Sequence, residues 1–235
     1  MTSTMTATAV AVQRVGKVYG TGHTAVAALT DATFTVAEGE FVALVGPSGS
    51  GKTTLLSVIG ALLRPTDGRV HVGAVDVTAL SRREQTAFRA LRIGFVFQSF
   101  NLVPFLTARE NLTLMAAFAG RSRRDAGRRA DELLDELGLA ERRHHLPEQL
   151  SGGERQRIAI GRAMFNDPPL ILVDEPTANL DTDRGRQVVQ LLAREIKQRG
   201  KAGIMVTHDV RMLAHTDRTL HLLDGRLTDR APEAG

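Results

Sequence analysis

The segment from Gly46 to Thr53 constrains the fold more than any other part of the chain. It matches the phosphate-binding pattern G-x-x-x-x-G-K-[ST] at every fixed position. The unbroken apolar run of residues 41–45 precedes it and predicts a strand buried on both faces. Residues 54–63 follow with a helical composition and no breaker at their start. A position between a buried strand and a helix N-terminus favours an anion-binding loop over a glycine-rich turn that happens to contain a lysine.

The chemistry of this loop indicates a nucleotide and a magnesium ion. Small residues let the backbone fold around phosphate groups and direct its N–H groups at them. Lys52 adds a full positive charge and is expected to act in binding and catalysis, and the Thr53 hydroxyl suits Mg²⁺. The residues expected to contact the nucleotide here are Gly46, Ser48, Gly49, Ser50, Gly51, Lys52, Thr53 and Thr54.

A second apolar run, residues 170–173, ends in two acidic residues, Asp174 and Glu175. Ligands of parallel α/β sheets bind at the carboxyl ends of the strands. We therefore expect Asp174 to help hold Mg²⁺, directly or through water. Glu175 is expected to polarise the water molecule that attacks the terminal phosphate.

Residues 150–156, with the sequence LSGGERQ, predict another helix start. Ser151 followed by Glu154 three residues later forms a capping box. A helix N-terminus that carries Gly152, Gly153 and a serine hydroxyl is also an anion site. Because a single domain rarely needs two phosphate sites, one explanation is that this site serves the nucleotide of another subunit.

The remaining patterns predict an α/β fold with a mainly parallel sheet, an N-terminal antiparallel β region and an inserted all-helical part. No convincing strand lies between about residues 100 and 165, where helical periodicity dominates and Gly138 closes one helix. Helices are also predicted after Ser81 and around residues 188–196. Strands are predicted at residues 10–19, 32–36, 69–77, 93–97 and 204–206, and a hairpin at 220–227.

Composition excludes several classes of function. The 235 residues include no cysteine, so disulfide, zinc-thiolate and thiol chemistry are impossible. No apolar run reaches the ~18–20 residues of a membrane helix, and residues 1–8 lack the features of a secretory signal. A net charge of +4 is mild, and we expect no nucleic-acid partner. These features predict a soluble, cytoplasmic protein.

With these motifs in order, the chain resembles the ATP-binding subunit of an ABC transporter from about residue 10 to residue 227. The LSGGE signature between Gln98 and the Asp174–Glu175 strand is specific to that superfamily. The resemblance implies one ATPase domain, 1–235, with a core at 1–98 and 166–235 and a helical subdomain at 99–165. It also implies a head-to-tail homodimer that sandwiches two ATP molecules, each between one phosphate loop and the other subunit's Ser151, Gly152 and Gly153.

The same resemblance assigns four further residues. Tyr19 matches the aromatic residue that stacks on adenine, although a half-buried tyrosine at a strand end is the structural alternative. Gln98 resembles the glutamine that contacts Mg²⁺ and links the site to the helical part. Asp181 ends the Asn179-Leu180-Asp181 loop that communicates across the dimer. His208 resembles the histidine that contacts the γ-phosphate.

Residues 94–111 and the Glu175–Asp181 segment further resemble exporters of the LolD/MacB/FtsE type, with Ala178 in place of their usual glycine. This implies a separate membrane permease and a position on the inner face of the cell membrane. The apolar stretch 100–106 is expected to line the groove that receives the permease, unless it packs within the helical part. Alternatives are a signalling complex of the FtsE type and an importer of the amino-acid type. An ABC ATPase that acts on ribosomes or DNA is disfavoured, because the chain lacks cysteines and long coiled coils.

Overall fold

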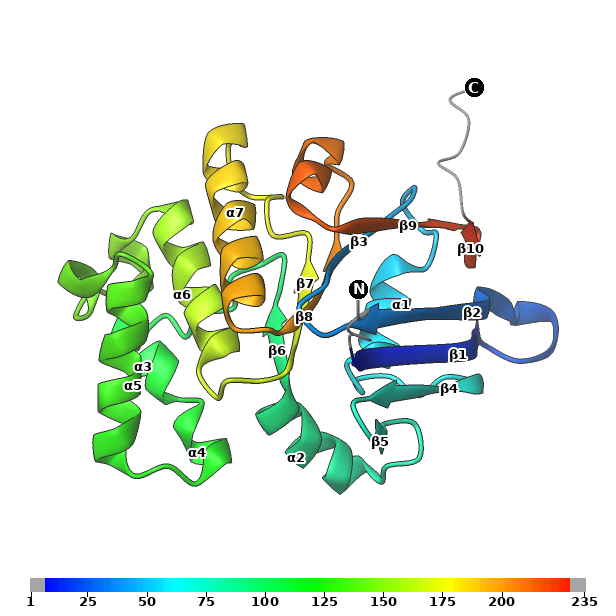
Figure 1. The fold of residues 1–235 in the computed structure, drawn as a ribbon, viewed down its shortest axis with the longest axis horizontal. Coiled ribbons are helices and arrows are strands. Elements are labelled where there is room, and N and C mark those ends of the chain that lie inside the picture. Colours follow the sequence, from blue (N-terminus) through cyan, green and yellow to red (C-terminus); the bar gives the residue numbers. More distant parts are fainter. Residues whose placement is uncertain (1–6, 229–235) are drawn as a thin grey trace, which may run out of the picture.

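A computed structural model describes residues 7–228, which form two β-sheets and a group of helices (Figure 1). The larger sheet has the strand order β10-β9-β3-β8-β7-β6, and the smaller one has the order β2-β1-β4-β5. This is the predicted α/β fold with one mainly parallel and one antiparallel sheet. The larger sheet consists of β3 (Phe41–Val45), β6 (Ile93–Val96), β7 (Leu170–Asp174), β8 (Ala202–Val206), β9 (Arg218–Leu223) and β10 (Arg226–Thr228).

Five of the six strands of the larger sheet run parallel, and only β10 pairs antiparallel with its neighbour. Every residue of β3 and β8 is buried, which is why these segments read as unbroken apolar runs rather than as alternating ones. The register places Leu44 opposite Val206 and Asp174 opposite the same residue. The carboxyl ends of β3, β7 and β8 therefore meet at one edge of the sheet.

The antiparallel sheet differs from the prediction in two strands. It consists of β1 (Thr8–Tyr19), β2 (Val26–Ala37), β4 (Asp67–Val72) and β5 (Val75–Asp76). The second strand begins six residues earlier than predicted, because an irregular stretch with Asp31 at φ 53° hides the alternation while the pairing with β1 continues. The strand predicted at 69–77 is interrupted at Gly73, where φ is 57° and the chain turns.

The helices are α1 (Lys52–Ile59), α2 (Arg82–Arg92), α3 (Ala108–Thr113), α4 (Ala116–Ala119), α5 (Arg123–Glu136), α6 (Gly152–Met164) and α7 (Thr182–Gln198). Short 3₁₀ turns lie at Gly22–Thr24, Ala140–Arg142, Pro147–Gln149 and Val210–His215. The helix after the phosphate loop ends at Ile59, earlier than its composition to residue 63 indicates. Ala61 has φ 53° there, and the N–H groups of Leu62 and Leu63 both donate to the carbonyl of Ser57.

Two clusters of buried apolar residues hold the fold together. One joins the antiparallel sheet, α1 and one face of the parallel sheet, and it includes Val10, Leu29 and Ile59. The other contains residues of α3, α5 and α6 together with Val173 of β7 and Val188 of α7. In Figure 1 the helices α3 to α6 lie on one side of the parallel sheet and the antiparallel sheet lies on the other. The helical stretch therefore shares a core with the sheet, and its division from the core at residues 98 and 166 stays a prediction.

Candidate functional site

The phosphate loop lies between β3 and α1, as its flanking sequence predicted. Gly51 caps α1 with φ 100°, a left-handed conformation that favours glycine. A Cβ atom at this position would also lie 2.3 Å from the carbonyl oxygen of Ala28 in β2. At Gly46 a Cβ atom would lie 2.0 Å from the carbonyl oxygen of Leu222 in β9. Both glycines are therefore required by close backbone approach.

Lys52 lies within this loop and is only 8 % exposed. Its ammonium group donates to the carbonyl oxygens of Gly46, at 2.9 Å, and Pro47, at 2.7 Å. An ammonium group has three donors, so one remains for another acceptor. The hydroxyl of Ser50 is buried and has no hydrogen-bond partner among the described residues. These groups fit an anion bound against the loop.

A cavity of about 330 Å³ opens over the loop. Glu175 and His208 line it together with most of the predicted loop residues: Gly46, Ser48, Gly49, Gly51, Lys52, Thr53 and Thr54. Ala28 and Val206 also line it, and the sequence did not indicate them. Both are small or aliphatic residues without a recognisable motif, so no signal could have found them.

Asp174 and Thr53 form the candidate magnesium site. The Thr53 hydroxyl lies 3.4 Å from the Asp174 carboxylate and donates to it. Burial, with a smaller contribution from the charge of Glu175, raises the pKa of Asp174. No group of three His, Cys, Asp or Glu residues suited to a metal occurs among residues 7–228. One hydroxyl and one carboxylate fit Mg²⁺ that takes its other ligands from phosphates and water.

Glu175 and His208 contact each other at the mouth of the cavity. The Nδ1–H of His208 donates to the Glu175 carboxylate at 2.9 Å. The Glu175 backbone has φ 47°, an uncommon conformation for a non-glycine residue, and its N–H donates to the Val206 carbonyl at 3.0 Å. The side chain of Glu175 is 15 % exposed and that of His208 is 70 % exposed. A backbone held in this way directs the carboxylate of Glu175 into the cavity.

The other predicted site residues lie outside this cavity. Ser151 caps α6, where its hydroxyl accepts from Glu154 N–H and its own N–H donates to the Glu154 carboxylate, which confirms the capping box. Asp181 caps α7 and is paired with Arg184. Tyr19 is exposed at the end of β1, with the Lys17 ammonium 5.2 Å from its ring centre. None of these three residues lines the cavity over the phosphate loop.

Gln98 follows β6 and is connected to the loop that contains Asp181. The amide nitrogen of Asn179 donates to the carbonyl oxygen of Gln98 at 2.9 Å. A Cβ atom at Gly152 would lie 3.3 Å from the Leu180 side chain. The start of α6, the 179–181 loop and Gln98 are therefore neighbours.

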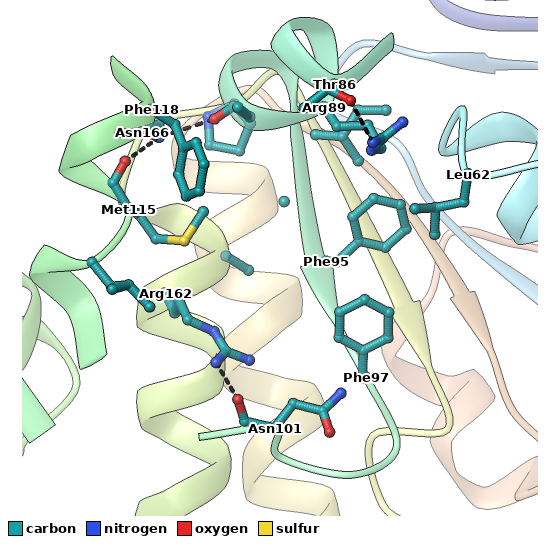
Figure 2. A pocket seen from close by; sticks show the side chains of 16 residues that line it. Leu62, Thr86, Arg89, Phe95, Phe97, Asn101, Met115, Phe118, Arg162 and Asn166 are labelled. Carbon is teal, nitrogen blue, oxygen red and sulfur yellow. Dashed lines mark hydrogen bonds between the residues drawn. The ribbon is translucent and has the colours of Figure 1, made fainter. Parts of the chain in front are cut away.

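A second, more apolar pocket of about 400 Å³ lies beside β6 (Figure 2). Figure 2 shows the rings of Phe95 and Phe97 on one side of the pocket and Met115 and Phe118 on the other. Of the stretch 100–106, which is expected to line the groove for the permease, only Asn101 lines this pocket. Phe100 stacks on Arg155, at 5.1 Å, and Phe105 is 77 % exposed outside the pocket, so the expectation for this stretch stays a prediction.

Arg162 of α6 lies in this pocket without an acidic partner among residues 7–228. Its guanidinium donates to the carbonyl oxygens of Phe100, at 2.9 Å, and Asn101. Burial lowers the pKa of Arg162. Arg89 also lines the pocket and donates to Ala61 and Thr86, again without an ion pair to the part of the chain that the structure describes. The pocket therefore combines apolar walls with two positive charges.

Three features define a P-loop ATPase. They are a phosphate loop at the carboxyl edge of a parallel sheet, acidic residues at the end of another strand of that sheet, and a helical stretch that precedes this strand in the chain. The chain belongs to the ABC transporter family, whose model matches residues 29–178. It is therefore an ATP-binding ATPase subunit of the ABC type. No helix among the described residues has the length and apolar character needed to cross a bilayer.

Named relatives and a solved structure agree with this family. The chain is 45 % identical to the macrolide export ATP-binding/permease protein MacB of Rhodopirellula baltica, covering 91 % of this chain and 31 % of that protein. It is 44 % identical to the putative hemin import ATP-binding protein HrtA of Staphylococcus aureus, covering 94 % and 100 %. The dimeric ATP-binding cassette MJ0796 bound to ADP and Pi superposes with a TM-score of 0.85 at 40 % identity, covering 96 % and 99 %.

Proposed function

We propose that this chain hydrolyses ATP as a homodimer to drive a separate integral membrane permease, in an exporter of the MacB or LolD type. The observation that carries the proposal is the pair of sites on one chain: a phosphate cavity and, across β6 and α6, an apolar pocket that contains two arginines. The first suits a nucleotide and the second suits a protein partner. The proposal places the subunit on the cytoplasmic face of the membrane.

Each predicted side chain in or around the cavity has a distinct proposed role. The loop N–H groups and Lys52 bind the phosphates, Tyr19 stacks on the adenine, and Thr53, Asp174 and Gln98 hold Mg²⁺, which supplies charge neutralisation when bound. Glu175 accepts a proton from the attacking water, and His208 orients Glu175 through the 2.9 Å contact while its exposed ring reaches the γ-phosphate. This division assigns proton transfer to one residue and orientation to the other.

A second copy of the chain completes the proposed site. Ser151, Gly152 and Gly153 lie outside their own chain's phosphate cavity, and they begin a helix whose N-terminus attracts anions. MJ0796 is a dimeric cassette bound to ADP and Pi, and it is similar to this chain over nearly its whole length. By analogy, each nucleotide lies between the phosphate loop of one copy and the α6 N-terminus of the other, with Asp181 near the contact.

The direction of transport rests on the relatives. The MacB relative is named for macrolide export and carries its permease in the same protein. HrtA is named for hemin import and matches over its whole length, so import is the second candidate function. Reconstitution of the subunit with its permease in proteoliposomes, with ATP added outside, distinguishes the two. Release of substrate from the lumen indicates import, and accumulation in the lumen indicates export, because the ATPase then faces outward. A complex that hydrolyses ATP and moves no substrate indicates the signalling alternative.

We propose that a cytoplasmic segment of the permease docks into the apolar pocket. An apolar segment with one carboxylate matches the Phe95, Phe118 and Arg162 surfaces, because an apolar occupant alone would bury the guanidinium unpaired. The stretch 100–106 borders this pocket through Asn101, and Phe105 extends from it into solvent. We retain Phe105 as a peripheral contact.

Replacing Phe118 by Ala is expected to weaken assembly with the permease while leaving the melting temperature and basal ATPase of the isolated subunit nearly unchanged. Phe118 is 58 % exposed, so it contributes little to the core, and exposed aromatic side chains dominate many interfaces. Phe105→Ala, at 77 % exposed, is expected to give a smaller loss. Pull-down with the tagged permease measures both. Full assembly of the Phe118 variant would exclude the pocket as the docking site.

Replacing Lys52 by Ala is expected to lower ATP affinity roughly 10–150-fold, the usual effect of losing a charge-assisted hydrogen bond. Lys201→Ala is the matched control, because Lys201 is also a shielded lysine but pairs with Asp167 at 3.0 Å, away from the cavity. Equilibrium titration with a fluorescent ATP analogue measures both variants. Equal affinities would mean that Lys52 does not contact the phosphates.

A further inference from the structure

Gln156 is a buried amide that lacks hydrogen-bond partners in the part of the chain that the structure describes. It lies in the second turn of α6 and has no solvent exposure. Neither its Nε2 nor its Oε1 atom has a hydrogen-bond partner among the described residues. An unpaired buried polar group is costly, and buried amides in folded proteins are nearly always paired. The conformation described here therefore disfavours a carboxamide at this position.

Asn111 shows what a satisfied buried amide in the same helical stretch looks like. It too has no solvent exposure. Its Oδ1 accepts from the N–H of Val103 at 2.8 Å, and its Nδ2 donates to the carbonyl oxygens of Leu106 and Thr107 at 2.9 and 3.1 Å. The lack of hydrogen-bond partners is therefore specific to Gln156 and is not shared by Asn111, a buried amide of the same helical stretch.

The surroundings of Gln156 indicate where partners are available. Gly152 and Gln156 are four residues apart in α6 and so lie on the same face of the helix. A Cβ atom at Gly152 would lie 3.3 Å from the Leu180 side chain and 3.8 Å from the Asn179 carbonyl oxygen. The loop that holds Asn179 and Leu180 follows directly after Glu175, and Asn179 donates to Gln98. Gln156 thus lies one turn from a backbone segment that connects to the candidate catalytic carboxylate.

We propose that Gln156 is a positioning residue whose amide pairs with the backbone of the 179–180 loop only when two copies close around ATP. In that state α6 is held at its N-terminus by the nucleotide of the other copy, and the amide gains a donor and an acceptor. The pairing fixes the chain segment that follows Glu175. This inference rests on the proposed contact of Ser151, Gly152 and Gly153 with the partner's nucleotide. It adds Gln156 as a residue that links this contact to the position of Glu175.

The test is Gln156→Met, which keeps the length of the side chain and removes both polar atoms. Without nucleotide, the melting temperature is expected to stay level or to rise by about 2–4 °C, because an unpaired amide is removed. In the Glu175→Gln background, the ATP concentration needed for dimerisation is expected to rise about tenfold or more. In the parent background, turnover falls while the affinity of the monomer for ATP is unchanged. A side chain with a purely structural role would not separate these readouts in this way.

Asn111→Leu is the matched control, and its melting temperature is expected to fall by at least about 5 °C, because it loses paired bonds. A comparable fall for Gln156→Met, or failure of that variant to fold, would overturn the proposal by showing that the amide is paired in the nucleotide-free protein. Unchanged dimerisation and turnover would overturn it as well. Neither result bears on the contact at Ser151, which a substitution at that residue tests separately.

Discussion

Replacing Glu175 by Gln is expected to slow ATP turnover by roughly 10²–10⁴-fold and to leave ATP binding intact. The amide keeps the size of the side chain but cannot accept the proton of the attacking water. The backbone of Glu175 stays fixed by the N–H bond to Val206, so the substitution changes chemistry and not placement. Single-turnover hydrolysis and equilibrium ATP binding, measured on the same preparation, check the two halves of the expectation.

The control for this experiment is Glu141→Gln, at an exposed residue in a 3₁₀ turn far along the chain from β7. It removes the same charge and is expected to hydrolyse ATP at the parent rate. His208→Ala is expected to lose activity too, because the 2.9 Å contact that orients the carboxylate disappears. If Glu175→Gln turned over ATP as fast as the parent, another residue would have to accept the proton.

Replacing Ser151 by Arg in the Glu175→Gln background is expected to abolish ATP-dependent dimerisation. In the proposed dimer this position faces the γ-phosphate of the other copy, and a long side chain there separates the two surfaces. Light scattering with and without ATP measures the shift from monomer to dimer in the Glu175→Gln parent and its loss in the double variant. ADP is expected to support no dimer in either protein, since it lacks the γ-phosphate.

Loss of the helix cap accompanies this substitution and has its own control. Ser151 and Ser122 both accept a hydrogen bond from the N–H three residues later, at 3.3 and 3.1 Å. Ser122→Arg removes the cap of α5 at a similar cost, about 1 kcal/mol, and is expected to leave dimerisation intact. A dimer that persists in the double variant with Ser151→Arg would contradict the cross-subunit site.

Most of this site could be predicted from the sequence, because phosphate binding requires particular residues at fixed spacing. Gly46, Gly51 and Lys52 were identifiable since the loop admits few alternatives. The capping box at Ser151 and the buried strands β3 and β7 follow from local rules in the same way. The irregular start of β2 was missed, because pairing with β1 and not alternation holds residues 26–31 in the strand.

The residues that the sequence did not reveal act through their place in the fold. Ala28 lines the phosphate cavity and meets Gly51 with its backbone carbonyl, which any residue would supply. In the sequence, Arg162 resembles any other charged residue of a helix. Its burial against residues 100–101 depends on how α6 packs. The apolar stretch 100–106 was assigned to the permease groove from its composition and its position after Gln98, and the pocket beside β6 has walls from other elements, among them β6 and α4.

The guanidinium of Arg162 connects α6 to the loop after Gln98. Its bond to the Phe100 carbonyl spans 2.9 Å, and such a bond is lost near ~3.5 Å. The same guanidinium also donates to the Asn101 carbonyl, so two bonds from one planar group tie α6 to this segment. In the proposed transporter, α6 and the chain after Gln98 would therefore move together when a permease docks.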